Sequence, residues 1–132
     1  RYTGSTETYT EESVGSVRCG EETGLDKAAA LGPVIALASE IENPNDLSIE
    51  LVIKRGGEIG FQGTTNTNQL HRTFADLVDY LYRDNTHYHG AILMTGTGIV
   101  PPSEFTLEAG DEVSITIDGI GTLTNQVIRL GA

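Results

Sequence analysis

The feature that most constrains the fold is an alternation of apolar and polar residues near the C-terminal end of the chain. Val113, Ile115 and Ile117 are separated by single polar residues, a period of two that is typical of a half-buried β-strand. Gly119 to Gly121 follows and predicts a tight turn into a second strand, Thr122 to Leu130. This part of the chain therefore predicts an antiparallel hairpin.

A second hairpin is predicted in the middle of the chain. Leu47 to Arg55 and Glu58 to Gly63 both alternate, and only Gly56 and Gly57 lie between them. A two-residue glycine turn is typical of a β-hairpin, because glycine adopts positive φ without steric cost. Asn43 to Asp46, just upstream, has the composition of a turn.

Two short apolar runs are predicted to be buried strands. They are Leu31 to Ala38 (LGPVIALA) and Ala91 to Met94 (AILM). The second run leads into Thr95-Gly96-Thr97-Gly98 and then into Ile99-Val100-Pro101-Pro102. The prolines there prevent further strand pairing, so we expect the second strand to end in a loop of small residues.

One helix is predicted, from about Thr67 to Arg83. The apolar residues that recur there at spacings of three and four are Leu70, Phe74, Leu77, Val78 and Leu81. An apolar stripe of this kind is how a helix packs on a sheet. The order of elements predicts a β-rich α+β fold in which one main helix lies against a rolled sheet.

Composition excludes several classes of partner. The 132 residues carry 19 acidic and 8 basic side chains, a net charge of -11, so nucleic acid and anionic membranes are poor partners. No apolar run approaches the ~20 residues that span a bilayer. A polyacidic chain whose only lysines are Lys27 and Lys54 is typical of a protein kept soluble in high salt, and an acidic domain of a mesophilic protein can have the same balance. The single Cys19 excludes an intrachain disulfide and a cysteine-based zinc site, which favours a reducing compartment.

The N-terminal part of the chain differs from the rest. Residues 1–25 are rich in Thr, Ser, Glu and Gly without an apolar period, and we interpret them as a polar surface segment that precedes one domain, residues 26–132. Because the first residue is Arg1, we expect the chain to be part of a longer one.

Two pairs of residues have the spacing of metal ligands. His87 and His89 would share a face on a strand, and Glu40 and Glu42 would do so on an extended segment. Neither pair has a third ligand close in sequence. We interpret the histidines as loop residues and the glutamates as solvated turn residues.

Two segments of small, hydroxyl-bearing residues are the better candidates for a binding site. Thr95, Gly96 and Thr97 form one, and Gly63-Thr64-Thr65, at the junction of the hairpin and the helix, forms the other. Hydroxyls and accessible backbone amides can hold a small carboxylate or keto oxygen. A purely structural turn explains the first segment equally well. If these residues bind a ligand, both segments could face one pocket.

The same residues carry a resemblance. LMTGTGIVPPSEFTLEAGDEVSITIDGIGTLTNQV resembles the end of the fumarylacetoacetate hydrolase superfamily, with its TGT loop, GD-x-V strand and G-x-L-x-N hairpin. ALGPVIALASEIENPNDLSIELVIKRGGEIGFQGTTNTNQL continues the match through an LGP strand and an N-P-x-D-L turn. The similarity covers about Asp26 to Leu130. TGTGIVPP with GTTNTNQL resembles the 2-keto-3-deoxy-pentonate dehydratases more than the acylpyruvate hydrolases, which carry TGTP.

The resemblance implies a lyase that takes part in sugar-acid catabolism. Such an enzyme removes water from a 2-keto-3-deoxy sugar acid, with Mg²⁺ chelating the keto acid and a base removing a C3 proton. Carried over to this chain, Thr65 and Thr97 would contact the substrate, while Gly63 and Gly96 would give the backbone access to it. The partner would be a small keto acid, and we expect a cytoplasmic homo-oligomer. The alternatives are an acylpyruvate-type hydrolase or decarboxylase, and a non-catalytic fragment.

The chain departs from the family pattern at the metal site. Family members bind the metal through an E-x-E pair and a later aspartate, all upstream of the matching part. Glu40-Ile41-Glu42 follows the LGP strand and is therefore in the wrong place. The family lysine would fall at Thr23, and Lys27 is out of register. No metal ligand and no catalytic residue is assigned from the sequence.

Overall fold

The computed structural model describes residues 29–129. The chain divides into two units, Arg1–Ala30 and Leu31–Ala132, and the described residues fall almost entirely in the second. The predicted polar segment, Cys19, Thr23 and Lys27 lie outside the described residues.

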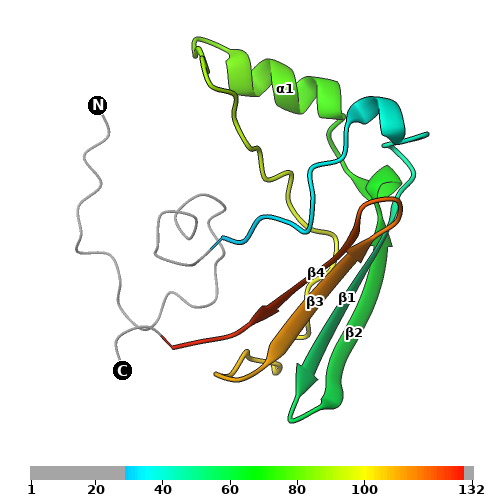
Figure 1. Ribbon diagram of the computed structural model, residues 1–132, viewed down its shortest axis with the longest axis vertical. Helices are drawn as coiled ribbons and strands as arrows, with labels where there is room; N and C mark the ends of the chain where they lie inside the picture. Colours follow the sequence, from blue (N-terminus) through cyan, green and yellow to red (C-terminus); the bar gives the residue numbers. More distant parts are fainter. Residues whose placement is uncertain (1–28, 130–132) are drawn as a thin grey trace. The chain divides into compact units, whose positions relative to one another are not determined.

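A four-stranded antiparallel sheet forms the centre of this unit (Figure 1). Its strands are β1 (Ser48–Arg55), β2 (Glu58–Asn66), β3 (Glu112–Ile117) and β4 (Gly121–Gln126), in the spatial order β2-β1-β3-β4. Both predicted hairpins are confirmed, although β2 extends three residues beyond Gly63, and β4 ends at Gln126. Gly56 and Gly57 have φ values of 60° and 89°, the positive values that a two-residue hairpin turn requires.

The register gives the sheet two chemically different faces. Leu51 pairs with Ile115, and Ile115 pairs with Leu123, so apolar side chains from three strands share one face. The opposite face is mainly polar, although Val52 lies on it, and its polar residues include Glu50, Gln62, Ser114, Thr116, Thr122 and Thr124. There the hydroxyls of Ser114 and Thr124 lie 2.9 Å apart, and those of Thr116 and Thr122 lie 2.8 Å apart.

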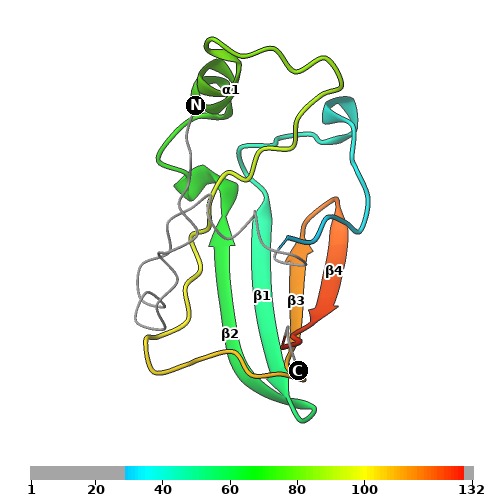
Figure 2. The same ribbon diagram turned by 90° about the vertical axis from the view of Figure 1, so that its left-hand side faces the viewer.

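The apolar face is only partly covered. Ile53 is 2% exposed and Ile99 is 9% exposed, and these two are the buried hydrophobic residues of the part that the structure describes. Ile115, on the same face, is 38% exposed. The segment that follows α1 runs beside β2 before it enters β3 (Figure 2), and it supplies Ile99 to the core. At β4, Gly32 and Pro33 lie close to Leu123 and Gly121, so two segments each cover part of the described sheet.

The helix is shorter than predicted. α1 spans Phe74–Tyr82, and a separate 3-10 turn, η4, spans Thr67–Gln69. Thr73 begins α1 because its hydroxyl accepts a hydrogen bond from the Asp76 amide at 3.1 Å. The Asp76 carboxylate accepts one in return from the Thr73 amide, which completes a capping box. No residue of α1 is buried, but Phe74, Leu77 and Leu81 of the predicted stripe are half-buried, so the described residues cover that stripe only in part.

The two predicted buried strands are also wrong. Leu31 to Leu37 lacks regular structure and precedes a 3-10 turn, η3 (Ala38–Glu40), while Ala91 to Met94 lacks regular structure throughout. Ile35 is 90% exposed and Ile92 is 67% exposed. An apolar run becomes a strand only when a neighbouring strand accepts its hydrogen bonds, and neither run pairs with β1 to β4.

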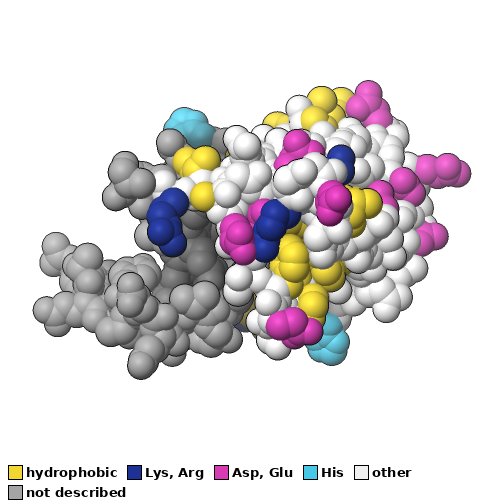
Figure 3. Space-filling view, turned by 90° about the horizontal axis from the view of Figure 1, so that it is seen from below, with side chains coloured by type: hydrophobic (Ala, Val, Ile, Leu, Met, Phe, Trp, Pro, Cys, Tyr) yellow, Lys and Arg dark blue, Asp and Glu magenta, His cyan; other side chains and the backbone are white. Residues whose placement is uncertain are grey.

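The surface of the described residues is mixed. On the face drawn in Figure 3, acidic side chains are scattered and hydrophobic side chains lie exposed between them. Among residues 29–129, none of the helices has the length and hydrophobicity needed to cross a membrane.

Candidate functional site

The candidate segment Gly63-Thr64-Thr65 lies within β2 and not at a junction of the hairpin and the helix. Gly63, Thr64 and Thr65 pair with Leu51, Glu50 and Ile49 of β1. Because side chains alternate along a strand, Gly63 and Thr65 belong to the apolar face, and the exposed Thr64 belongs to the polar face. Thr64 therefore cannot share a site with its two neighbours.

The other candidate segment, around Thr95 to Thr97, leads into residues that lie directly against Gly63 and Thr65. A Cβ atom built on Gly98 would be 2.7 Å from the Thr65 Oγ1, closer than real side chains approach. In the same way, a Cβ on Gly63 would be 2.7 Å from the Ile99 Cγ2. Glycine at both positions is what permits this contact. The structure thus brings together Gly63 and Thr65 with the Thr95–Gly98 loop, which we call the TGTG loop.

Within the TGTG loop, Thr97 shapes the turn. Its Oγ1 accepts a hydrogen bond from the Ile99 amide at 3.1 Å and donates one to the Ile99 carbonyl at 3.2 Å. Gly96 has a φ of 94° with open space around its Cα, so the requirement for glycine there is conformational. Thr95 is exposed.

These contacts define what the site can do chemically. The Thr65 hydroxyl lies at the contact with the loop, and the Thr97 hydroxyl lies on the loop itself. Hydroxyls of this kind can donate to a carboxylate or a keto oxygen. Thr97 can donate to a ligand once it releases the Ile99 carbonyl, a bond whose 3.2 Å length indicates a weak interaction.

A polar cluster at the end of β2 follows Thr65 in the chain, and sequence reasoning did not predict it. The Asp46 carboxylate accepts hydrogen bonds from the side-chain Nδ2 of Asn66, at 3.0 Å, and from that of Asn68, at 3.2 Å. Thr67 donates to the Pro44 carbonyl at 2.8 Å and accepts from the Leu47 amide at 2.9 Å. The NPND turn and the NTN segment therefore form one bonded unit next to Thr65.

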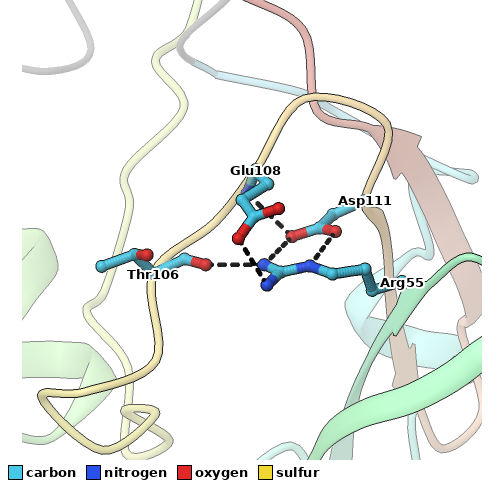
Figure 4. Close-up of polar contacts among 4 residues, drawn as sticks. All are labelled: Arg55, Thr106, Glu108 and Asp111. Carbon is cyan, nitrogen blue, oxygen red and sulfur yellow. Dashed lines mark hydrogen bonds and ion pairs between the residues drawn. The ribbon is translucent and has the colours of Figure 1, made fainter.

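A second cluster, missed by sequence reasoning, fixes the other end of the segment that carries the loop (Figure 4). Arg55 at the end of β1 donates from Nε and Nη2 to the two carboxylate oxygens of Asp111, each at 2.8 Å. It also donates to the Thr106 carbonyl and to a carboxylate oxygen of Glu108, each at 2.7 Å. We call these four residues the Arg55 cluster. Charge-assisted pairs of this bidentate form are the stronger hydrogen bonds of proteins.

Asp111 is the buried carboxylate of this cluster. It is 1% exposed, and its Oδ2 also accepts a hydrogen bond from the Glu108 amide at 2.8 Å. The hydrogen bonds from Arg55 and then from the Glu108 amide lower the pKa of Asp111 to about 2, against the smaller opposing effect of burial. The hydrogen bond to Asp111 correspondingly raises the pKa of Arg55. Both groups are therefore charged at neutral pH.

Aromatic contacts connect the Arg55 cluster to β2. The Arg55 guanidinium carbon lies 5.4 Å from the centroid of the Phe105 ring, and that ring lies 5.9 Å from the Phe61 ring. A Cβ on Gly60 would be 3.2 Å from Phe105 Cε2, so a glycine again permits close approach to β2.

The residues considered as metal ligands have other partners. The Glu40 carboxylate accepts a hydrogen bond from the Leu37 amide at 3.4 Å and so caps η3. With Glu42, Asp46 and Asp118, it lines an open acidic depression. The His87 Nε2 lies 3.3 Å from the Leu81 carbonyl and the ring stacks edge-on against Tyr82, while His89 is exposed.

Magnesium is the cofactor that the resemblance implies, and the described residues do not fit it. Within residues 29–129, no group of three or more histidine, cysteine, aspartate or glutamate side chains is arranged to hold a metal ion. Asp111, the buried carboxylate, already has both oxygens bonded to Arg55.

Comparisons with known proteins identify relatives for most of the chain. The profile of the family "Fumarylacetoacetate (FAA) hydrolase C-terminal" matches residues 7–128, and so begins upstream of Asp26, where the recognisable motifs start. The probable 2-keto-3-deoxyxylonate dehydratase of Haloferax volcanii is 40% identical over 77% of this chain. The 2-dehydro-3-deoxy-D-arabinonate dehydratase of Saccharolobus solfataricus is 47% identical over 74% of it. The oxaloacetate tautomerase YisK of Bacillus subtilis is 34% identical over 78% of it.

Solved structures give the same picture. A 2-keto-3-deoxy-D-arabinonate dehydratase complexed with magnesium and 2,5-dioxopentanoate superposes with a TM-score of 0.71 at 46% identity. That match covers 74% of this chain and 34% of the dehydratase. The apo form of that dehydratase gives the same TM-score. The chain spans about a third of the length of the curated relatives that it matches, with 35%, 33% and 34% of the three named above.

Proposed function

Because the chain belongs to the fumarylacetoacetate hydrolase C-terminal family, we propose that it is part of a magnesium-dependent lyase that dehydrates 2-keto-3-deoxy sugar acids in pentose catabolism. The observation that carries this proposal is the fold match to a dehydratase at 46% identity and a TM-score of 0.71. Identity at this level over three quarters of the chain favours a shared reaction more than a shared fold alone.

In this proposal, β2 and the TGTG loop form the substrate side of the active site. Thr65 and Thr97 donate hydrogen bonds to the keto acid. Gly96 leaves open space for it, while Gly63 admits the Ile99 side chain and so brings the loop against β2. The contact of Gly98 with Thr65 supports the assignment, because it places the loop beside the strand residue that would share the ligand. Thr95, which is exposed, would contact the substrate at its edge, while Thr64 lies on the opposite face of the sheet and is outside the proposed site.

The proposed reaction removes one water molecule. A base takes a proton from C3 of the 2-keto-3-deoxy-pentonate, and the C4 hydroxyl leaves with a proton as water, which forms a C3=C4 double bond. A proton is then lost from C5 and one is added at C3, so that the double bond moves to C4=C5, and this enol of C5 tautomerises to the aldehyde. The product is 2,5-dioxopentanoate, the compound named in the solved dehydratase complex. The two threonines would hold and orient the carboxylate and keto oxygens. The base and the magnesium ligands are not assigned to residues 29–129.

Several finer properties belong to the same proposal. We expect the protein to be a cytoplasmic homo-oligomer from a halophilic organism, and we expect its sheet to be rolled. A net charge of -11 and a relative from Haloferax volcanii support the halophilic origin. The partly open apolar face of the sheet, where Ile115 is 38% exposed, supports a rolled sheet, because rolling would cover that face.

The test is a substrate assay on the longest natural form of the protein that contains this chain. With magnesium present, 2-keto-3-deoxy-arabinonate or 2-keto-3-deoxy-xylonate should yield 2,5-dioxopentanoate. Acylpyruvate and oxaloacetate, assayed in parallel, represent the hydrolase and tautomerase alternatives. Turnover of either in place of the sugar acids would reassign the activity. No turnover of any substrate, with no sub-millimolar magnesium binding by calorimetry, would favour a non-catalytic role.

The role of the threonine hydroxyl is tested by Thr97→Val. Loss of a hydrogen bond to a charged ligand group weakens binding by roughly 1.5–3 kcal/mol, so we expect KM for the keto acid to rise about tenfold or more. Thr122→Val makes the same chemical change on the polar face of the sheet and should leave KM unchanged. An unchanged KM in the Thr97 variant would remove Thr97 from the proposed site.

A further inference from the structure

We infer that Arg55 and Asp111 are positioning residues for the TGTG loop. Their ion pair, acting through Phe105, holds the segment that keeps the loop against β2. The meaning of this for substrate binding rests on the proposed function, while the mechanical link is a property of the chain alone.

The first step is the bond between β1 and the segment before β3. The Arg55 guanidinium joins one strand end to three residues of that segment, which are Thr106, Glu108 and Asp111. Asp111 is the member that is buried, and it also accepts the Glu108 amide. Removing its negative charge leaves the guanidinium without its bidentate partner, so the segment loses its strongest attachment to β1.

The second step connects this attachment to β2. Phe105 lies between Arg55 and Phe61, and it contacts the backbone at Gly60. Since Arg55 bonds the adjacent carbonyl of Thr106, the ring and the ion pair fix neighbouring points of one segment. Phe105 is therefore the point at which the Arg55 cluster holds the segment on β2.

The third step runs from Phe105 back to the loop. Five residues separate Phe105 from Ile99, and two of them are Pro101 and Pro102, whose φ angles are fixed. The Phe105 amide also bonds the Pro102 carbonyl at 2.9 Å, which closes a turn. A connection this short and stiff transmits a displacement of Phe105 to Ile99, whose side chain packs on Gly63.

The C-terminal end of the segment, at Gly110 and Asp111, is attached separately to the chain after β4. Its exchange rates can therefore be compared with those near the TGTG loop. The Gly110 amide donates to the Val127 carbonyl at 2.8 Å, and the Val127 amide donates to the Asp111 carbonyl at 2.7 Å. These backbone bonds do not involve the Asp111 carboxylate. A change at that carboxylate should therefore loosen the part of the segment toward the TGTG loop and leave its join to β3 and β4 intact.

The experiment is amide hydrogen exchange on the chain itself, comparing Asp111→Asn with the unchanged sequence. Asparagine keeps the size of the side chain and removes its charge. The Ile99 amide, which is bonded to the Thr97 hydroxyl, should exchange about tenfold faster or more in the variant. Amides of β1 around Ile53 should keep their rates, which shows that the sheet remains folded. Unchanged exchange at Ile99, or equal acceleration at Ile53, would overturn the inference.

Two further variants complete the test. Glu112→Gln removes the same charge from the adjacent residue, whose 3.9 Å ion pair with Lys54 is exposed, and it should leave Ile99 exchange unchanged. Phe105→Leu keeps the ion pair and removes the ring, and it should accelerate Ile99 exchange as Asp111→Asn does. If Asp111→Asn does not fold, Phe105→Leu provides the test. Ile99 exchange in that variant at the rate of the unchanged chain would contradict a link through Phe105.

Activity provides the readout that separates this inference from the proposed function. In the active protein, Asp111→Asn should raise KM for the 2-keto-3-deoxy sugar acid more than it lowers kcat, because the loop binds substrate and the chemistry lies elsewhere. A fall in kcat alone would contradict positioning of the loop. If no keto acid is processed while Ile99 exchange accelerates, the proposed function fails and the mechanical link stands.

Discussion

Asp111 shows how a single residue can set the properties of a whole segment. Its carboxylate is almost fully removed from solvent and is bonded on both oxygens by Arg55. An unpaired carboxylate in that position would carry a large desolvation cost. The hydrogen bonds from Arg55 and from the Glu108 amide offset that cost and hold the pKa of Asp111 near 2. The residue therefore contributes to stability only while it is charged.

The first prediction concerns acid. The pKa of Asp111 is lower in the folded chain, about 2, than its ordinary value of 3.8, so its contribution to stability is present above pH 3.8 and is lost as pH falls toward 2. Asp111→Asn never has this contribution. Its thermal unfolding midpoint should therefore lie below that of the unchanged chain at neutral pH, by about 5 °C or more. The difference should narrow between about pH 4 and pH 2.

Circular dichroism melts at several pH values make this measurement. Glu108→Gln is the control, because the Glu108 side chain is 62% exposed and Arg55 keeps its other three bonds. The difference in unfolding midpoint between Asp111→Asn and the unchanged chain could also stay constant from neutral pH to pH 2. That result would show that the charge of Asp111 is not what stabilises the fold.

At the scale of elements, α1 is held mainly by its own sequence. None of its residues is buried, and Phe74, Leu77 and Leu81 are half-buried, so tertiary packing in the described unit covers the helix only in part. The reciprocal bonds of Thr73 and Asp76 satisfy amides at its first turn. A nine-residue helix without burial is short for independent stability, which makes the cap unusually important.

The second prediction is that Thr73→Ala frays α1. Loss of an N-cap threonine costs about 1 kcal/mol of helix stability, and no core contact compensates for it here. Amides of α1 should exchange roughly fivefold faster, and the helical signal in circular dichroism should fall. Thr86→Ala, the same change in the exposed chain after the helix, should alter neither quantity. Equal effects of both substitutions would mean that the cap is dispensable.

Elements with local signals were the ones that the sequence predicted well. Gly56 and Gly57 specify a hairpin turn by themselves, and the alternation through Ile115 specifies β3 without reference to other strands. The runs at Leu31 to Ala38 and Ala91 to Met94 were wrongly assigned, because an apolar run does not say which strand, if any, will pair with it. The helix began at Thr73 and not at Thr67 because only Thr73 has an acidic residue three positions later to complete the cap.

The candidate site, like the fold, was predicted from the sequence only in part. Gly63, Thr65 and the TGTG loop were found by their small side chains, and the structure places them in contact. Their role in binding remains a prediction. The Arg55 cluster was not predicted, because Arg55 and Asp111 are 56 residues apart and a charged pair at that separation leaves no pattern in a single sequence. The GD-x-V motif was noticed as a family signature, yet its aspartate was not recognised as the partner of Arg55.

At the scale of the whole molecule, charge is the dominant property. A net charge of -11 on 132 residues makes the chain repel itself, and Figure 3 shows acidic side chains spread over the described surface. Hydrophobic side chains are exposed between them, so the described unit combines self-repulsion with an incompletely covered core.

The third prediction follows from this combination. Raising KCl from about 0.1 M to about 2 M shortens the screening length from about 10 Å to less than 3 Å, which weakens the repulsion between acidic residues. The thermal unfolding midpoint should rise by several degrees, as measured by calorimetry. A variant in which several exposed glutamates are replaced by glutamine should show a smaller rise. A midpoint that is insensitive to KCl, or that falls, would contradict both the repulsion and the halophilic origin.

The polar face of the sheet bears on where such a chain can work. β3 and β4 are joined across that face by hydroxyl pairs, Ser114 with Thr124 and Thr116 with Thr122, which neither titrate in the physiological range nor attract counterions. This cross-strand adhesion is therefore indifferent to the ionic composition of the surrounding medium. The acidic surface can adapt to brine while the C-terminal hairpin keeps the same geometry in dilute buffer, so transfer between the two media need not change its strand register.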